Sequence, residues 1–134
     1  MTRPLLLVAA ATAALGACAS SSSGPSGFAA DVTIVANASA LTTTAFSPDS
    51  FTISLAAKDT ISWRNADVGT PGDGYGGGAT PGVSHHIVSD SAGVFDLGVM
   101  TPGAIVTHNF TTPGKFHYHC AIHPGMVGVI VVTS

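Results

Sequence analysis

Short apolar segments, some of them alternating with polar residues, recur along the chain from about residue 31 onward. In the first, Asp31–Asn37, the side chains of Val32, Ile34 and Ala36 would share one face, because successive side chains of a strand point to opposite sides. The same reading predicts further strands at Phe51–Leu55, Thr60–Trp63, His85–Ser89, Val94–Leu97, Ile105–Thr111, Lys115–Cys120 and Val127–Thr133. No segment has a convincing helical period, so we predict an all-β domain over residues 31–134.

Turn residues separate these segments, as at Thr112-Pro113-Gly114 before the last pair of strands. The chain is 46% hydrophobic and only 8% charged, which suits a single packed domain without long charged helices. Regular short strands joined by turns predict a Greek-key β-sandwich of about eight strands. Gly69–Gly82 interrupts this regularity with seven glycines. We interpret it as a flexible insertion between two strands that could also shape the rim of a site.

The first 30 residues have a different character. Arg3 precedes the apolar run Leu5–Ala14, which is too short to span a bilayer, and residues 1–17 therefore read as an export signal. Leu15-Gly16-Ala17-Cys18 resembles the lipobox of bacterial lipoproteins, where cleavage precedes the cysteine and its sulfur is lipidated. The alternative is an ordinary cleavable signal that ends near Ala17 or Ala19.

On the lipoprotein interpretation, residues 18–30 comprise the lipidated Cys18 and a tether rich in serine and glycine. We then expect an exported lipoprotein, anchored in a membrane of the cell envelope and facing the periplasm. Lipidation would leave Cys120 as the one remaining thiol of a chain with two cysteines, and metal ligation is a role for such a thiol. The net charge of −3 and the lack of a basic cluster make nucleic acid an unexpected partner.

The C-terminal part of the chain contains Cys120, His123 and Met126 in what should be a tight loop between two strands. Thiolate, imidazole and thioether are ligands that suit one copper ion cycling between Cu(I) and Cu(II), and a second imidazole would complete a His2Cys plane. The pair His85-His86 is the natural donor. Strand alternation leaves either one open, because it does not say which face points inward. The bland alternatives are a buried core cysteine, a core methionine, or a zinc ion bound without the methionine.

Several segments in order resemble the cupredoxin family, in particular small plastocyanin-like and amicyanin-like blue copper proteins. They are Phe46–Ile53, Asp59–Asn65, His85–Asp90, Phe95-Asp96, Thr101–Gly103 and Thr112–Cys120. The resemblance implies His85 as the first ligand, followed by Cys120, His123 and Met126, with His86 at a position that is usually Asn or Thr. The short spacing from Cys120 to Met126 is similar to that of amicyanin.

The resemblance also implies a function. We expect a type 1 copper protein that shuttles single electrons and docks its redox partners near a surface-exposed edge of His123. The alternative is a copper-carrying or delivery protein of the cell envelope, for which His86, His117 and His119 could serve as surface histidines. We do not expect an enzyme. Asp90 and Asp96 are scattered carboxylates without a paired partner, so acid/base catalysis has no support.

Overall fold

The structure is a computed structural model, and it describes residues 29–72 and 78–134. This part of the chain forms a β-sandwich with a single short 3-10 helix, η1, at Ala38–Ala40. Its strands are β1 (Val32–Ile34), β2 (Phe46–Ser47), β3 (Ser50–Ser54), β4 (Thr60–Asn65), β5 (Gly69–Thr70), β6 (Thr80–Pro81), β7 (His85–Ser89), β8 (Asp96–Met100), β9 (Ile105–Asn109), β10 (Gly114–Cys120) and β11 (Val127–Thr133).

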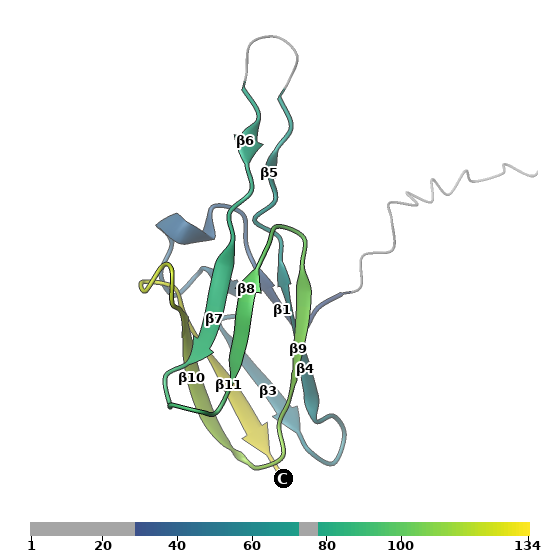
Figure 1. Cartoon of the computed structure of the whole chain (residues 1–134). Coiled ribbons are helices and arrows are strands. Elements are labelled where there is room, and N and C mark those ends of the chain that lie inside the picture. The colour runs from purple at the N-terminus through teal and green to yellow at the C-terminus, as the bar shows by residue number, and fades with distance from the viewer. Residues whose placement is uncertain (1–28, 73–77) are drawn as a thin grey trace, which may run out of the picture.

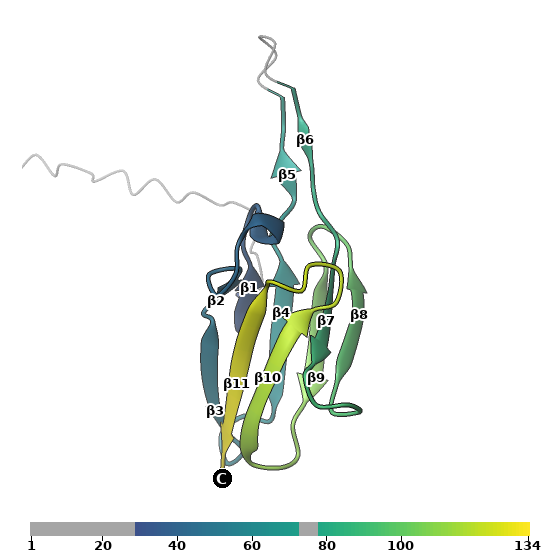
Figure 2. The ribbon, with the colours of Figure 1, turned by 90° about the vertical axis from the view of Figure 1, so that its left-hand side faces the viewer.

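Two sheets pack face to face, as Figures 1 and 2 show. One has the strand order β2-β1-β4-β9, and the other has the order β3-β11-β10-β7-β8. The chain crosses repeatedly between the sheets, since β3 and β4 follow each other in sequence but belong to different sheets, and so do β8 and β9. The all-β Greek-key sandwich predicted from the sequence is therefore confirmed.

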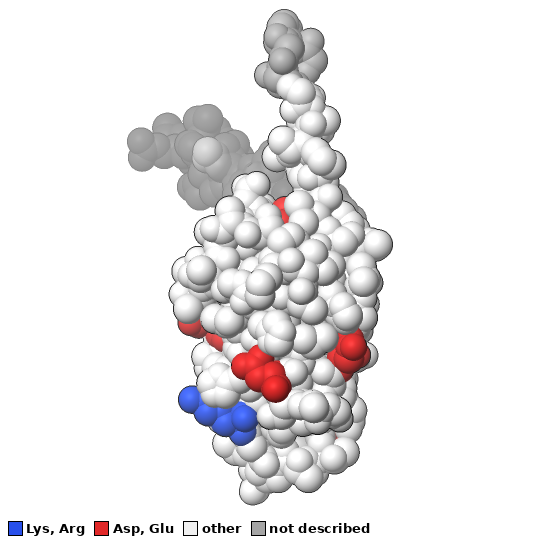
Figure 3. Space-filling view, turned by 60° about the vertical axis from the view of Figure 1, so that its left-hand side comes forward, with Lys and Arg blue, Asp and Glu red and all other residues white. Residues whose placement is uncertain are grey.

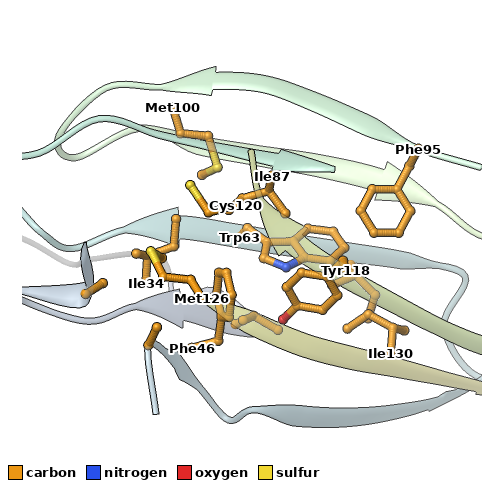
Figure 4. Close-up of a cluster of buried hydrophobic side chains, with 14 of the residues drawn as sticks. Ile34, Phe46, Trp63, Ile87, Phe95, Met100, Tyr118, Cys120, Met126 and Ile130 are labelled. Carbon is orange, nitrogen blue, oxygen red and sulfur yellow. The ribbon is translucent and has the colours of Figure 1, made fainter. Parts of the chain in front are cut away.

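The core lies between the sheets and is rich in aromatic side chains. Strand alternation builds it: in β4, Ile61 and Trp63 are buried while their neighbours are only partly covered. Tyr118 packs edge-on against Phe46 at 4.9 Å and against Trp63 at 6.0 Å between ring centroids (Figure 4). Aromatic pairs in these orientations stabilise a core beyond the area that they bury.

Some element boundaries differ from the predictions. The sequence led us to expect about eight strands, whereas the described residues form eleven, because β2, β5 and β6 are pairs of residues too short to give a periodic signal. The predicted strand Val94–Leu97 lies later, at β8, and the first strand is shorter because Asn37 adopts a left-handed backbone at φ 59° just before η1.

The glycine-rich insertion is more ordered than we expected in its described part. Thr70 pairs with Thr80 and Gly69 with Pro81, so β5 and β6 form a hairpin that projects from one end of the sandwich (Figures 1 and 2). Gly69 has a φ of 75°, and a Cβ there would lie 2.0 Å from the carbonyl oxygen of Thr80. Only glycine fits that position, so the composition of this segment follows partly from the hairpin.

Several predictions concern residues outside the described part. The export signal over residues 1–17, the lipidated Cys18 and nearly all of the tether over 18–30 lie there, as do residues 73–77 of the glycine-rich segment. Within the described residues, no helix is long and apolar enough to cross a membrane.

Candidate metal centre

Three side chains predicted as metal ligands converge at the end of the sandwich that carries the hairpin. The Sγ atom of Cys120 lies 3.8 Å from Nδ1 of His85 and 3.7 Å from Nδ1 of His123. The donor atoms of these three residues all lie within 4.8 Å of one another. Cys120 and His85 are fully buried, and His123 is partly exposed.

The separations fit a bound metal ion. With metal–sulfur and metal–nitrogen bonds of about 2.3 Å and about 2.0–2.1 Å, a trigonal site separates its sulfur and nitrogen donors by about 3.8 Å. The observed distances of 3.7 and 3.8 Å match this value. Spacing alone does not select the metal, but a thiolate with two imidazoles is a donor set that suits copper.

The sheet positions two of the three donors. Cys120 ends β10 and His85 begins β7, and these strands pair antiparallel with Cys120 opposite Ile87. His85 and Ile87 share the buried face of β7, whereas His86 lies on the other face. The structure therefore brings His85 to the thiol and turns the side chain of His86 away, to Asp96 at 2.6 Å.

The loop between β10 and β11 supplies the third donor and closes tightly on itself. The backbone N–H of Cys120 donates to the carbonyl of Met126 at 3.1 Å, and that of Met126 donates to the carbonyl of His123 at 3.0 Å. Met126 is fully buried, and its sulfur lies at the same end of the core as that of Cys120 (Figure 4). The backbone N–H of His86 also donates to the Cys120 sulfur at 3.4 Å, so this buried sulfur has a hydrogen-bond donor of its own.

A buried carboxylate that our sequence reasoning missed lies beside the site. Oδ2 of Asp67 is 3.2 Å from Nε2 of His85, and Asp67 is only 3% exposed. Burial lowers the pKa of the His85 imidazole below its usual range, while the hydrogen bond to Asp67 partly opposes this shift. A neutral imidazole is the form that binds a metal ion. In the sequence, Asp67 is one more acidic residue after a strand, 18 positions before His85, and no motif marks it.

The other histidines near the site face solvent. Nδ1 of His119 is hydrogen-bonded to Asp90 at 2.6 Å, and Nε2 of His86 is hydrogen-bonded to Asp96 at 2.6 Å. Histidines on the outer face of the sheet thus pair with these two carboxylates, an arrangement that the sequence did not indicate. Both pairs are largely exposed, and neither belongs to the three-residue donor cluster.

The surface of the loop that carries His123 is partly apolar. Ile122 is 49% exposed and Val127 is 39% exposed, and no Asp, Glu, Lys or Arg occurs from Phe116 to Ser134. In Figure 3, most of the charged side chains on the visible face lie on the part of the body away from the hairpin. The loop that carries His123 thus has no charged side chain of its own, and Asp90 lies beside it, next to Pro124 and Val127.

Comparison with known proteins assigns the fold. A purple cupredoxin from Nitrosopumilus maritimus has a TM-score of 0.61 and 24% sequence identity, and the match covers 78% of this chain and 99% of that one. A copper-containing nitrite reductase from Thermus scotoductus SA-01 has a TM-score of 0.52 and 29% identity over 66% of this chain, but the match spans only 20% of the enzyme. No protein-family model and no curated protein matches the chain by sequence.

These likenesses show that the chain has the cupredoxin fold, as the sequence resemblance led us to expect. The donor cluster stands independently of them, because it follows from the distances within this structure.

Proposed function

We propose that this protein is a mononuclear type 1 copper protein that transfers single electrons between redox partners. The observation that carries the proposal is the convergence of the Cys120 sulfur with Nδ1 of His85 and of His123 on one point. Met126 would contribute a thioether sulfur to the set. Bound copper would supply a one-electron couple between Cu(II) and Cu(I).

The chain's own residues would keep the site rigid. Cys120 and His85 project from paired strands, and the hydrogen bonds within the loop fix the backbone between Cys120 and Met126. Burial of both side chains excludes water from most of the site. A site that is held in one geometry has little to reorganise when its charge changes, which favours fast electron transfer.

His123 would serve as the electron port. It is the only one of the three clustered donors that reaches the surface, and the exposed side chain of Ile122 lies next to it. We propose that redox partners dock here through an uncharged, apolar surface of their own, since the loop that carries His123 and Ile122 contains no Asp, Glu, Lys or Arg. Such a contact would be small and short-lived, as electron-transfer encounters are.

The decisive experiment is the absorption spectrum of copper-loaded protein. We expect an intense visible band from thiolate-to-copper charge transfer, which is lost in Cys120→Ser and in His85→Ala but retained in His86→Ala. The last variant is the matched control, because His86 is the neighbour whose side chain points to the other face. A colourless copper protein, or a band that survives removal of Cys120, would falsify the proposal.

Redox titration separates electron transfer from copper delivery. An electron carrier should cycle reversibly between both states while it keeps its copper, and should hold copper against a chelator in each state. A delivery protein should instead release Cu(I) to an acceptor and lose its colour irreversibly during cycling. The buried thiolate and the closed loop favour retention of the metal.

A further inference from the structure

Asp67 is a buried carboxylate that lies beside the metal-binding residues but is not one of them. It is only 3% exposed, in a chain with few charged residues, and it lies between β4 and the projecting hairpin. A buried carboxylate is costly unless every oxygen finds a donor. Here Oδ1 accepts the backbone N–H of Asn37 at 3.0 Å, and Oδ2 faces Nε2 of His85 at 3.2 Å. Both oxygens are thus committed, one of them to a candidate metal ligand.

A second buried residue, Asn65, holds Asp67 in place. Oδ1 of Asn65 accepts the backbone N–H of Asp67 at 2.9 Å. Its Nδ2 donates to the carbonyl of Val83 at 2.8 Å and to that of Met100 at 3.0 Å. Asn65 therefore joins the segment that carries Asp67 to the segment just before His85 and to the end of β8.

The chain also leaves room for this arrangement at Gly82. A Cβ atom at Gly82 would lie 2.8 Å from the carbonyl oxygen of Asp67 and 2.7 Å from Cγ of Pro102. The carbonyl of Asp67 accepts the N–H of Val83 at 2.9 Å, so the two segments run in close contact. The position of the carboxylate is therefore determined by several independent contacts.

We propose that Asp67 is a positioning residue of the metal centre: its carboxylate holds the proton of His85 on Nε2 and keeps Nδ1 free to face the Cys120 sulfur. An ionised carboxylate only accepts hydrogen bonds, so Nε2 must be the donor. In a neutral imidazole the other nitrogen is then unprotonated. That nitrogen, Nδ1, is the atom 3.8 Å from Cys120. This inference rests on the proposed metal site and specifies how the buried histidine is oriented within it.

The negative charge has a second consequence. An anion beside His85 stabilises Cu(II) more than Cu(I), because the oxidised ion carries the larger positive charge. Hydrogen bonding to the carboxylate also makes the imidazole a stronger donor. Both effects act in the same direction, so Asp67 should lower the reduction potential of the site.

The first test needs neither a variant nor bound metal. In metal-free protein labelled with ¹⁵N, the ring nitrogens of His85 should show the tautomer with a proton on Nε2 and none on Nδ1 at a pH where the ring is neutral. A proton on Nδ1 of His85 would overturn the proposal, whatever metal the protein binds. Failure of the copper function would appear separately, as the absence of the visible band.

The second test compares Asp67→Asn with Asp96→Asn. Both changes remove one carboxylate that is hydrogen-bonded to a histidine of the pair His85-His86, but Asp96 is exposed and its histidine points away from the thiol. Asp67→Asn should weaken copper binding about 10–100-fold. It should also raise the potential by the equivalent of about tenfold in the Cu(II)/Cu(I) ratio, which is about 59 mV for one electron.

Asp96→Asn should change both quantities by less than about twofold, as expected for an exposed pair that solvent screens. Circular dichroism of the metal-free variants reports whether Asp67→Asn folds, and the tautomer measurement on the wild-type protein decides the matter if it does not. Equal shifts in the two variants, or an unchanged potential in a folded Asp67→Asn protein, would show that Asp67 only supports the fold.

Discussion

Two buried methionines lie near the donor cluster, and they have different structural origins. Met126 closes the loop that begins at Cys120, because its carbonyl accepts the backbone hydrogen bond of Cys120. Met100 ends β8 opposite His85 and comes from a distant part of the chain. Figure 4 shows both sulfur atoms at the same end of the core as that of Cys120. Either thioether is therefore chemically suited to a copper site, and only substitution distinguishes their roles.

We predict that Met126→Leu raises the reduction potential of copper-loaded protein and alters its visible spectrum, whereas Met100→Leu leaves both nearly unchanged. Loss of a thioether donor would destabilise Cu(II) more than Cu(I), and a shift of about 59 mV would correspond to a tenfold change in their ratio. Leucine conserves the volume of methionine, so each variant should lose less than about 1.5 kcal/mol of unfolding free energy. Voltammetry provides the measurement, and the opposite pattern would assign the thioether to Met100.

The pairing of β10 with β11 supports the site, because it fixes the long strand that ends at Cys120. Tyr118 lies opposite Gly128 in this pair. A Cβ atom at Gly128 would lie 2.5 Å from the Tyr118 hydroxyl oxygen. The ring is fully buried between Phe46 and Trp63, so it has no free space into which to move. Gly128 is therefore needed for the close approach of strand and ring.

We predict that Gly128→Ala destabilises the fold by about 1–3 kcal/mol, the usual cost of overpacking a dense core. Gly125→Ala is the matched control. Gly125 lies three residues before Gly128, and a Cβ there would make only an ordinary contact of 3.7 Å with Thr42. Urea unfolding of the metal-free variants measures both losses of unfolding free energy, provided that the m-values stay the same as in the wild-type protein. Similar losses in the two variants would contradict the explanation from the Tyr118 contact.

The ends of β7 and β10 that carry His85 and Cys120 lie at the end of the sandwich from which the hairpin projects (Figure 1). The lipid anchor that we propose at Cys18 would tether this body to a membrane through residues 18–30. A tether of this composition would leave the body free to turn His123 and Ile122 toward a partner. Anchoring would thus restrict the search for a redox partner to the membrane surface.

The anchor can be tested with the two cysteines of the chain. We predict that cells fed a labelled fatty acid incorporate the label into the wild-type protein and into Cys120→Ser, but not into Cys18→Ser. Cys120→Ser is the control because it removes the other thiol and leaves the signal segment intact. An unlabelled wild-type protein whose mature chain begins near Ala19 would support an ordinary cleavable signal instead.

Much of the fold was predictable because strand periodicity is a local property. The buried positions of β4 alternate as its sequence does, and the predicted bounds of β7 and β11 agree with the structure. The short strands were missed because a strand of two residues is too short to show alternation. The hairpin was missed because glycine has no side chain, so a glycine-rich segment shows no alternation of apolar and polar positions. Asp67 was missed because its partner, His85, lies 18 positions away in the sequence, beyond β5 and β6, and no local pattern relates the two residues.

The sequence by itself determined the strand faces and the order of donors between Cys120 and Met126, since both depend on residues close together in the chain. The tertiary structure alone decided which face of β7 is buried, and with it that His85 rather than His86 lies beside the thiol. It also placed the Asp67 carboxylate against that histidine. Alternation relates one side chain to the next, but only the packing of two sheets defines which side is the interior.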